Sequence, residues 1–220
     1  MSIFQNLSTI KHTIPKGVTL VAVSKTKPVS DIQEAYDAGQ RVFGENKIQE
    51  MVAKYDELPK DISWHMIGHL QSNKVKYMAL FVDLIHGVDS FTTLIEINKQ
   101  AKKHNRVINC LLQLKIAQED SKFGLTKEEI NNILSSYDYK NMENIKVVGL
   151  MGMASFVEDE QQIKNEFATL KTFYDELKVH HTQFNTISMG MSGDYELAIE
   201  QGSNMVRVGS AIFGNRNYHQ

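Results

Sequence analysis

The chain has 220 residues, of which 42% are hydrophobic and 23% charged, and 24 basic against 26 acidic side chains leave a net charge of −2. That balance argues against a nucleic-acid partner, which requires a basic face. No stretch approaches the roughly 18 consecutive apolar residues of a membrane span. The lone Cys110 excludes an intramolecular disulfide framework and a thiolate zinc site. We expect a cytoplasmic, monomeric protein with a single domain over residues 1–220 and no nucleic-acid or membrane partner.

Short apolar runs rich in Val, Ile and Leu recur along the chain and predict eight β-strands. Most of the runs are continuous rather than alternating, which is typical of strands that are covered on both faces. In chain order the predicted strands are residues 19–25, 41–46, 63–68, 81–89, 108–115, 145–153, 185–191 and 204–213.

Helical patterns separate these runs. Ser30 with Gln33, and Thr126 with Glu129, have the spacing of capping boxes that begin helices. The first of these two helices is expected to end at Gly39. The other predicted helices are residues 46–58, 90–105, 158–180 and 194–201.

The alternation of strands and helices is typical of βαβ units and therefore of a parallel sheet. Such a sheet either closes into a (β/α)8 TIM barrel or stays open and doubly wound. Eight strands within about 200 to 250 residues suit the barrel. The first strand is followed by KTKPVS rather than by the Gly-rich turn of an open dinucleotide-binding sheet. The sequence therefore predicts an α/β fold with one (β/α)8 barrel.

A lysine follows the first predicted strand, at the end of the barrel where the active sites of this fold lie. Lys25 would stand at the mouth of an apolar barrel, where burial favours the neutral amine, a nucleophile towards carbonyl groups. The alternative is that Lys25 only begins a solvated loop, as Lys27 before Pro28 is expected to do.

Glycine and serine follow the seventh and eighth strands, where barrels commonly bind phosphate through backbone N–H groups and a short helix. Ser188, Gly190 and Ser192 follow one strand, and Gly209 and Ser210 follow the other, although such residues also form ordinary turns. A nucleophilic lysine beside a phosphate site predicts a ligand with an aldehyde and a phosphate. Pyridoxal 5′-phosphate (PLP) has both, and a phosphorylated sugar on an aldolase-like lysine would fit as well.

No metal site is expected. His65 and His69 are four residues apart, but no acidic ligand set accompanies them.

Several segments, taken in chain order, resemble the pyridoxal phosphate homeostasis protein family. That family is itself similar to the barrel domain of alanine racemase without its second domain. The matching segments run from Leu20 to Arg216, and SKTKP, IGHLQSNK and SMGMS are specific in combination although weak alone. The full set is LVAVSKTKP, FGEN, WHMIGHLQSNK, LMGMA, ISMGMSGD and VRVGSAIFG.

The resemblance implies how these residues would bind PLP. Lys25 would carry PLP as a Schiff base, and Arg207 would face the pyridine nitrogen. Family members more often have threonine where this chain has Ser210, so a hydroxyl group is retained. The resemblance further implies that Asn46, His65 and Met151 line the cofactor cleft and that Ser188, Ser192, Gly209 and Ser210 hold the phosphate.

An arginine in that place also has a consequence for catalysis. It stays protonated, so the pyridine nitrogen only accepts a hydrogen bond and the ring is a weaker electron sink. The resemblance further implies that racemases with this arrangement use a second acid/base, a tyrosine from a second domain and the neighbouring subunit, and we expect this chain to have no such domain. We therefore expect a PLP-binding protein for intracellular PLP homeostasis and delivery to apo-enzymes, with little or no catalysis. A PLP-dependent amino-acid racemase is the alternative, and a Schiff-base aldolase without cofactor is a third hypothesis.

Overall fold

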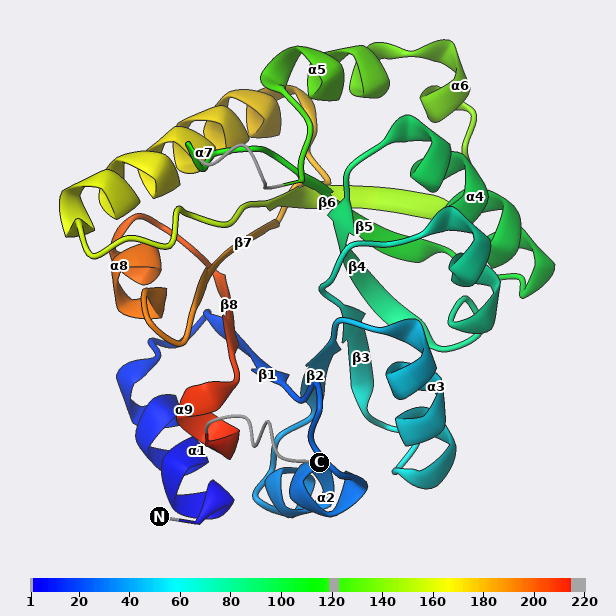
Figure 1. Cartoon of the computed structure of the whole chain (residues 1–220). Helices are drawn as coiled ribbons and strands as arrows, with labels where there is room; N and C mark the ends of the chain where they lie inside the picture. Colours follow the sequence, from blue (N-terminus) through cyan, green and yellow to red (C-terminus); the bar gives the residue numbers. More distant parts are fainter. Residues whose placement is uncertain (1, 119–122, 215–220) are drawn as a thin grey trace.

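A computed structural model of the protein describes residues 2–118 and 123–214, and it contains a closed barrel of eight parallel strands. Each strand pairs with the next in sequence, and β1 pairs with β8, with Thr19 opposite Met205. Figure 1 shows the helices arranged outside this ring of strands. The predicted (β/α)8 barrel is confirmed. The remaining positions of the predicted 1–220 domain lie outside the described residues.

The strands coincide closely with the apolar runs, except at the end of the chain. The predicted strand 204–213 is too long. Strand pairing ends at Val208, and Ser210–Phe213 form a short helix. Ile212 and Phe213 are buried on that helix, and an apolar run alone does not distinguish a strand from a buried helix. The strands are β1 (Thr19–Val23), β2 (Val42–Glu45), β3 (Ser63–Met66), β4 (Val82–Val88), β5 (Ile108–Gln113), β6 (Ile145–Met151), β7 (Thr186–Met191) and β8 (Met205–Val208).

The helices between strands mostly follow the sequence patterns. In the capping box of Thr126 and Glu129, the Thr126 hydroxyl accepts from the Glu129 N–H and the carboxylate accepts in return, as predicted. The box predicted at Ser30 is wrong, because Pro28, with its fixed φ, occupies the N-cap and Ser30 is already helical. The helices are α1 (Ile3–Thr13), α2 (Val29–Asp37), α3 (Ile48–Glu57), the 3₁₀-helix η1 (Ser72–Tyr77), α4 (Phe91–Lys103), α5 (Lys127–Ser135), α6 (Tyr137–Lys140), α7 (Glu160–His180), α8 (Tyr195–Glu200) and α9 (Ser210–Phe213).

Helix α1 precedes the barrel and has no counterpart among the predicted helices. Ser2 and Gln5 form its capping box, and its buried face includes Leu7. The Asn6 side chain donates to the carbonyl of Ile212 in α9 over 2.9 Å. Figure 1 shows α1 and α9 side by side next to β1 and β8. The two ends of the described chain thus meet where the barrel closes.

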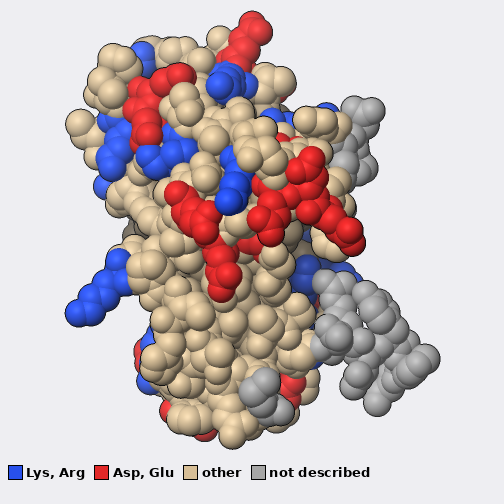
Figure 2. Space-filling view, turned by 90° about the vertical axis from the view of Figure 1, so that its left-hand side faces the viewer, with Lys and Arg blue, Asp and Glu red and all other residues tan. Residues whose placement is uncertain are grey.

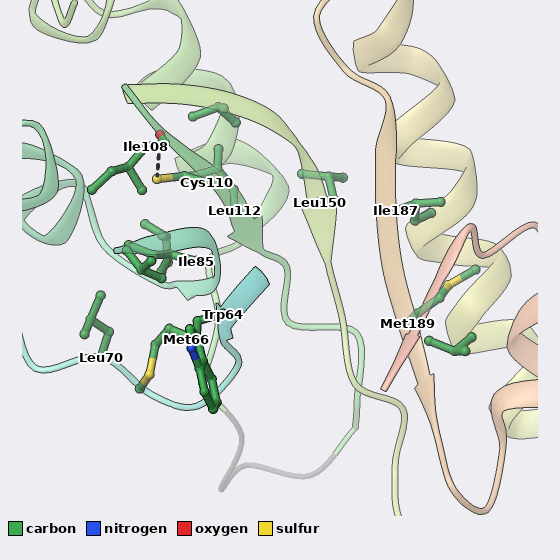
Figure 3. Close-up of a cluster of buried hydrophobic side chains, with 14 of the residues drawn as sticks. Trp64, Met66, Leu70, Ile85, Ile108, Cys110, Leu112, Leu150, Ile187 and Met189 are labelled. Carbon is green, nitrogen blue, oxygen red and sulfur yellow. Dashed lines mark hydrogen bonds between the residues drawn. The ribbon is translucent and has the colours of Figure 1, made fainter. Parts of the chain in front are cut away.

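Apolar side chains fill both sides of the strand ring. The larger cluster packs between strands and helices, and part of it, including Trp64 and Cys110, is drawn in Figure 3. Burial raises the pKa of the Cys110 thiol, which agrees with an inert side chain. A smaller cluster lies inside the barrel and consists of Val21, Ile67, Leu84, Leu111, Val148, Met151 and Met205.

The outer surface shows no dominant charge on the face in Figure 2. Basic and acidic side chains are mixed over its upper part, and few of either kind lie over its lower part. Among the described residues, no helix is both long enough and apolar enough to cross a membrane.

Candidate functional site

A cavity of about 600 Å³ opens where the strands end at their carboxyl termini. The loops after β1, β2, β7 and β8 contribute to its wall, and Arg207 reaches it from within β8. Val23, Ile67 and Met153 add an apolar surface. The structure therefore brings together six of the nine site residues predicted from the sequence, namely Lys25, Asn46, Ser192, Arg207, Gly209 and Ser210.

Lys25 lies in a turn whose preceding residue, Ser24, is bonded to a buried ion pair. The Ser24 hydroxyl donates to Glu45 Oε1 over 2.6 Å. Lys54 Nζ, from α3, donates to the Ser24 carbonyl over 2.8 Å and to Glu45 Oε1 over 2.7 Å. Burial raises the pKa of Glu45, and the charge of Lys54 opposes that shift. The Glu45–Lys54 ion pair therefore connects the end of β1 with β2 and α3 next to Lys25.

The other side of the turn is also fixed. Thr26 has a φ of 63°, in the left-handed region that a threonine rarely adopts. Its N–H donates to Glu50 Oε2 over 2.9 Å, which stabilises this backbone conformation. Lys27, expected in a solvated loop, instead lines the cavity and donates to the Phe213 carbonyl over 2.8 Å.

The loops after β7 and β8 are joined at the opposite wall. The Gly209 N–H donates to the Ser192 hydroxyl over 3.0 Å, and Ser210 begins α9 beside it. At Gly190, φ is +96° and a Cβ would stand 2.6 Å from the Ala198 Cβ, so only glycine lets β7 approach α8 this closely. Small residues and hydroxyl groups thus form one wall.

Arg207 is 3% exposed and forms part of the cavity wall. Its Nη1 donates to the Ser188 hydroxyl over 2.5 Å and its Nη2 to the Gly152 carbonyl over 3.1 Å. No carboxylate in the described part of the chain forms an ion pair with it. Burial lowers the pKa of Arg207 to about 10 and the charge of Asp194 opposes this, so the guanidinium is positive at neutral pH. The cavity wall therefore contains the fixed positive charge of Arg207, whose N–H groups can donate to a hydrogen-bond acceptor.

The other three predicted site residues lie deeper than the cavity wall. Ser188 is fully buried and contacts Arg207 and His86. His65 is also buried and lies 3.0 Å from His86. Met151 belongs to the apolar cluster inside the barrel. These side chains support the site from below rather than line it.

Sequence reasoning missed two parts of this arrangement. His86 makes two of the buried polar contacts, one to His65 and one to Ser188. In the sequence, the only indication of this role is that His86 is a lone histidine within the apolar run VDLIHGV. The loop after β6 also contributes Phe156 and Val157 to the cavity rim, and Phe156 is 92% exposed. An exposed aromatic side chain in a loop has no periodicity that would reveal its position.

Comparison with known proteins places this barrel in a family. The family model "Alanine racemase, N-terminal domain" matches residues 1–217. The pyridoxal phosphate homeostasis protein of Aquifex aeolicus is 39% identical over 202 residues, which cover 90% of this chain and 87% of that protein. The Escherichia coli K12 protein of the same name is 40% identical over 211 residues, covering 93% and 88%.

Solved structures agree with this assignment. PipY of Synechococcus elongatus PCC7942, solved with PLP bound, has a TM-score of 0.89 and 34% identity, covering 97% of this chain and all (100%) of that one. An alanine racemase of Clostridium difficile 630 has a TM-score of 0.77 at 14% identity, and the match covers 57% of that chain. This second likeness concerns the fold. The chain belongs to the alanine racemase N-terminal domain family and, within it, to the pyridoxal phosphate homeostasis proteins.

Proposed function

We propose that this protein binds PLP through Lys25 and takes part in holding and supplying PLP, with little or no catalysis of its own. The observation that carries the proposal is the convergence of Lys25, Arg207 and the Ser/Gly loops on one cavity. PipY, solved with PLP bound, and the relatives named for PLP homeostasis support it.

The side chains in the wall fit PLP by their chemistry. A cavity of about 600 Å³ accommodates one ligand of that size. We assign Lys25 to the aldehyde, Arg207 to the pyridine nitrogen, and Ser192, Gly209 and Ser210 to the phosphate. When bound, PLP supplies an aldehyde that condenses with the lysine amine, releasing water and forming a coloured Schiff base.

Arg207 supports a carrier rather than an efficient catalyst. Its guanidinium is positive and keeps its protons, so it donates a hydrogen bond to a ring nitrogen without protonating it. A pyridine that is not protonated is a poor electron sink for carbanion chemistry. A PLP-dependent racemase with Lys25 as one base is the second candidate, and the match of residues 1–217 to the model of the alanine racemase N-terminal domain favours it.

We further propose that the protein acts as a cytoplasmic monomer and passes PLP to apo-enzymes. The exposed rim at Phe156 and Val157 leaves the cavity accessible from outside. Mixing the loaded protein with an apo-transaminase tests delivery, which requires activation faster than that by free PLP. Incubation with each alanine enantiomer tests the second candidate, because exchange of the α-hydrogen at enzymic rates would establish a racemase.

The decisive experiment is the absorbance spectrum of the protein with PLP before and after borohydride, followed by peptide mapping. We expect a yellow protein in which borohydride fixes PLP to the peptide that contains Lys25. Lys25→Ala should lose the colour and keep the fold. Lys47→Ala is the matched control, because Lys47 is 73% exposed and lies outside the cavity. A protein that stays colourless with added PLP would refute the proposal.

A further inference from the structure

Four buried side chains, Arg207, Ser188, His86 and His65, form a continuous line of hydrogen bonds beneath the cavity, which we call the relay. Arg207 on β8 contacts Ser188 on β7 over 2.5 Å. The Ser188 hydroxyl lies 2.9 Å from His86 Nδ1 on β4, and His86 Nε2 lies 3.0 Å from His65 Nδ1 on β3. Figure 1 shows β7 and β8 on the opposite side of the ring from β3 and β4, so the line crosses the barrel.

The direction of these bonds follows from the arginine. A guanidinium only donates, so the Ser188 oxygen accepts from Nη1. The buried Ser188 hydroxyl proton needs an acceptor of its own, and His86 Nδ1, 2.9 Å away, is the side chain's other partner, which assigns the proton to that bond. His86 must then carry its proton on Nε2, which donates to His65 Nδ1. His65 in turn carries its proton on Nε2, which is 3.4 Å from the Ser63 hydroxyl. Every bond in the line runs away from Arg207.

This arrangement requires both imidazoles to be neutral. A second proton on His65 would place an N–H against the N–H of His86, and one on His86 would oppose the Ser188 hydroxyl proton. Burial lowers the pKa of His65 to about 3. Burial, and then the charges of His65 and Arg207, hold the pKa of His86 well below its ordinary value. Among the described residues, His65 and Arg207 are the titratable groups whose charges lower the pKa of His86.

We propose that Ser188, His86 and His65 are positioning residues that hold the Arg207 guanidinium in one orientation. Nη1 is fixed by Ser188 and Nη2 by the Gly152 carbonyl, which leaves the remaining N–H groups directed by the planar geometry of the guanidinium. The ligand class that this favours is a heteroaromatic ring whose nitrogen accepts a hydrogen bond. For PLP, the inference rests on the proposed function. The inferred tautomers and neutral state of His65 and His86 do not depend on the proposed function.

The first test uses the protein without PLP. Long-range ¹H–¹⁵N correlation spectra report the tautomer and charge of each imidazole, and His65→Gln and His86→Gln assign the signals. We expect His65 and His86 to be neutral Nε2–H tautomers between about pH 5 and pH 9. An Nδ1–H tautomer or a doubly protonated ring at either position in that range would overturn the relay.

The second test asks whether the relay positions Arg207 for the ligand. Ser188→Ala removes the acceptor of Nη1, and we expect about tenfold weaker PLP binding and an altered pH profile of the visible absorbance. Ser203→Ala is the matched control, because Ser203 is also buried and its hydroxyl donates to the backbone carbonyls of Ile187, Met189 and Met205. It should leave PLP affinity and the pH profile unchanged.

The outcomes separate the relay from the proposed function. Borohydride should still attach PLP to Lys25 in Ser188→Ala, because the lysine turn is built from other residues. Wild-type affinity together with a wild-type pH profile in Ser188→Ala would refute the positioning role. Failure of every variant, and of the wild type, to bind PLP would refute the proposed function, and the imidazole tautomers would still test the relay.

Discussion

Gly149, in the middle of β6, has no room for a side chain. Its φ is 157°, and an added Cβ would overlap the carbonyl oxygen of Thr186 on β7. We therefore expect Gly149→Ala to lower the free energy of unfolding by about 4 kcal/mol or more, measured by chemical denaturation. Gly193→Ala should change it by less than about 0.5 kcal/mol, because a Cβ there meets nothing within 4 Å. Equal stability of the two variants would contradict the packing between β6 and β7.

The sequence predicts the residues of the cavity wall better than those beneath it. Lys25, Gly209 and Ser210 follow strand ends, and the carboxyl ends of parallel barrel strands meet at one face. Ser188 and His65 lie within strands, where a continuous apolar run does not reveal which side chains face the barrel axis. Whether such a side chain lines the cavity or supports it depends on strand tilt and depth, which only the closed barrel defines.

A buried ion pair between Glu45 and Lys54 contributes to the contact between α3 and the β1–α2 turn, beside the bond from the Thr26 N–H to Glu50. Glu45 is fully buried, with a side-chain exposure of 0%, and Lys54 is 8% exposed. Lys54→Met leaves the Glu45 carboxylate without its cation, so we expect the free energy of unfolding at pH 7 to fall by about 3–5 kcal/mol. Chemical denaturation measures the loss.

Two further variants check that explanation. Adding Glu45→Gln to Lys54→Met removes the unpaired charge, so the double variant should recover much of the lost stability. Lys171→Met breaks the exposed ion pair with Asp175 and should cost less than about 1 kcal/mol. If Lys54→Met is no more destabilising than Lys171→Met, the buried pair does not hold this turn.

Among the elements, those with strong hydrophobic periodicity could be predicted, whereas a capping pattern alone was not sufficient. The strand runs and the Thr126 capping box were clear signals. Helix α1 had a weaker one, the Ser2–Gln5 box ahead of apolar residues such as Leu7. The segment of η1 replaces an α-helix between β3 and β4, and its sequence SNKVKY has no apolar face of helical length.

For the whole molecule, the buried relay predicts sensitivity to acid. An unfolded histidine has a pKa of about 6.5, whereas the folded pKa of His65 is about 3 and that of His86 is well below the ordinary value. Between these values the unfolded chain binds more protons than the folded one, so the free energy of unfolding decreases as the pH falls below about 6.5. At full effect, each histidine contributes about 1.4 kcal/mol per pH unit.

The test compares slopes, because carboxylates elsewhere add the same background to every variant. We expect unfolding free energies measured between about pH 4.5 and pH 6.5 to fall less steeply for His65→Gln/His86→Gln than for the wild type. The difference should approach about 2.7 kcal/mol per pH unit at the acid end. Ser203→Ala, which removes a buried hydroxyl and no titratable group, should keep the wild-type slope. Equal slopes for the wild type and the double variant would mean that the histidines are not held neutral. A shallower slope in the double variant would instead mean that the burial which keeps His65 and His86 neutral also limits the stability of the barrel in acid.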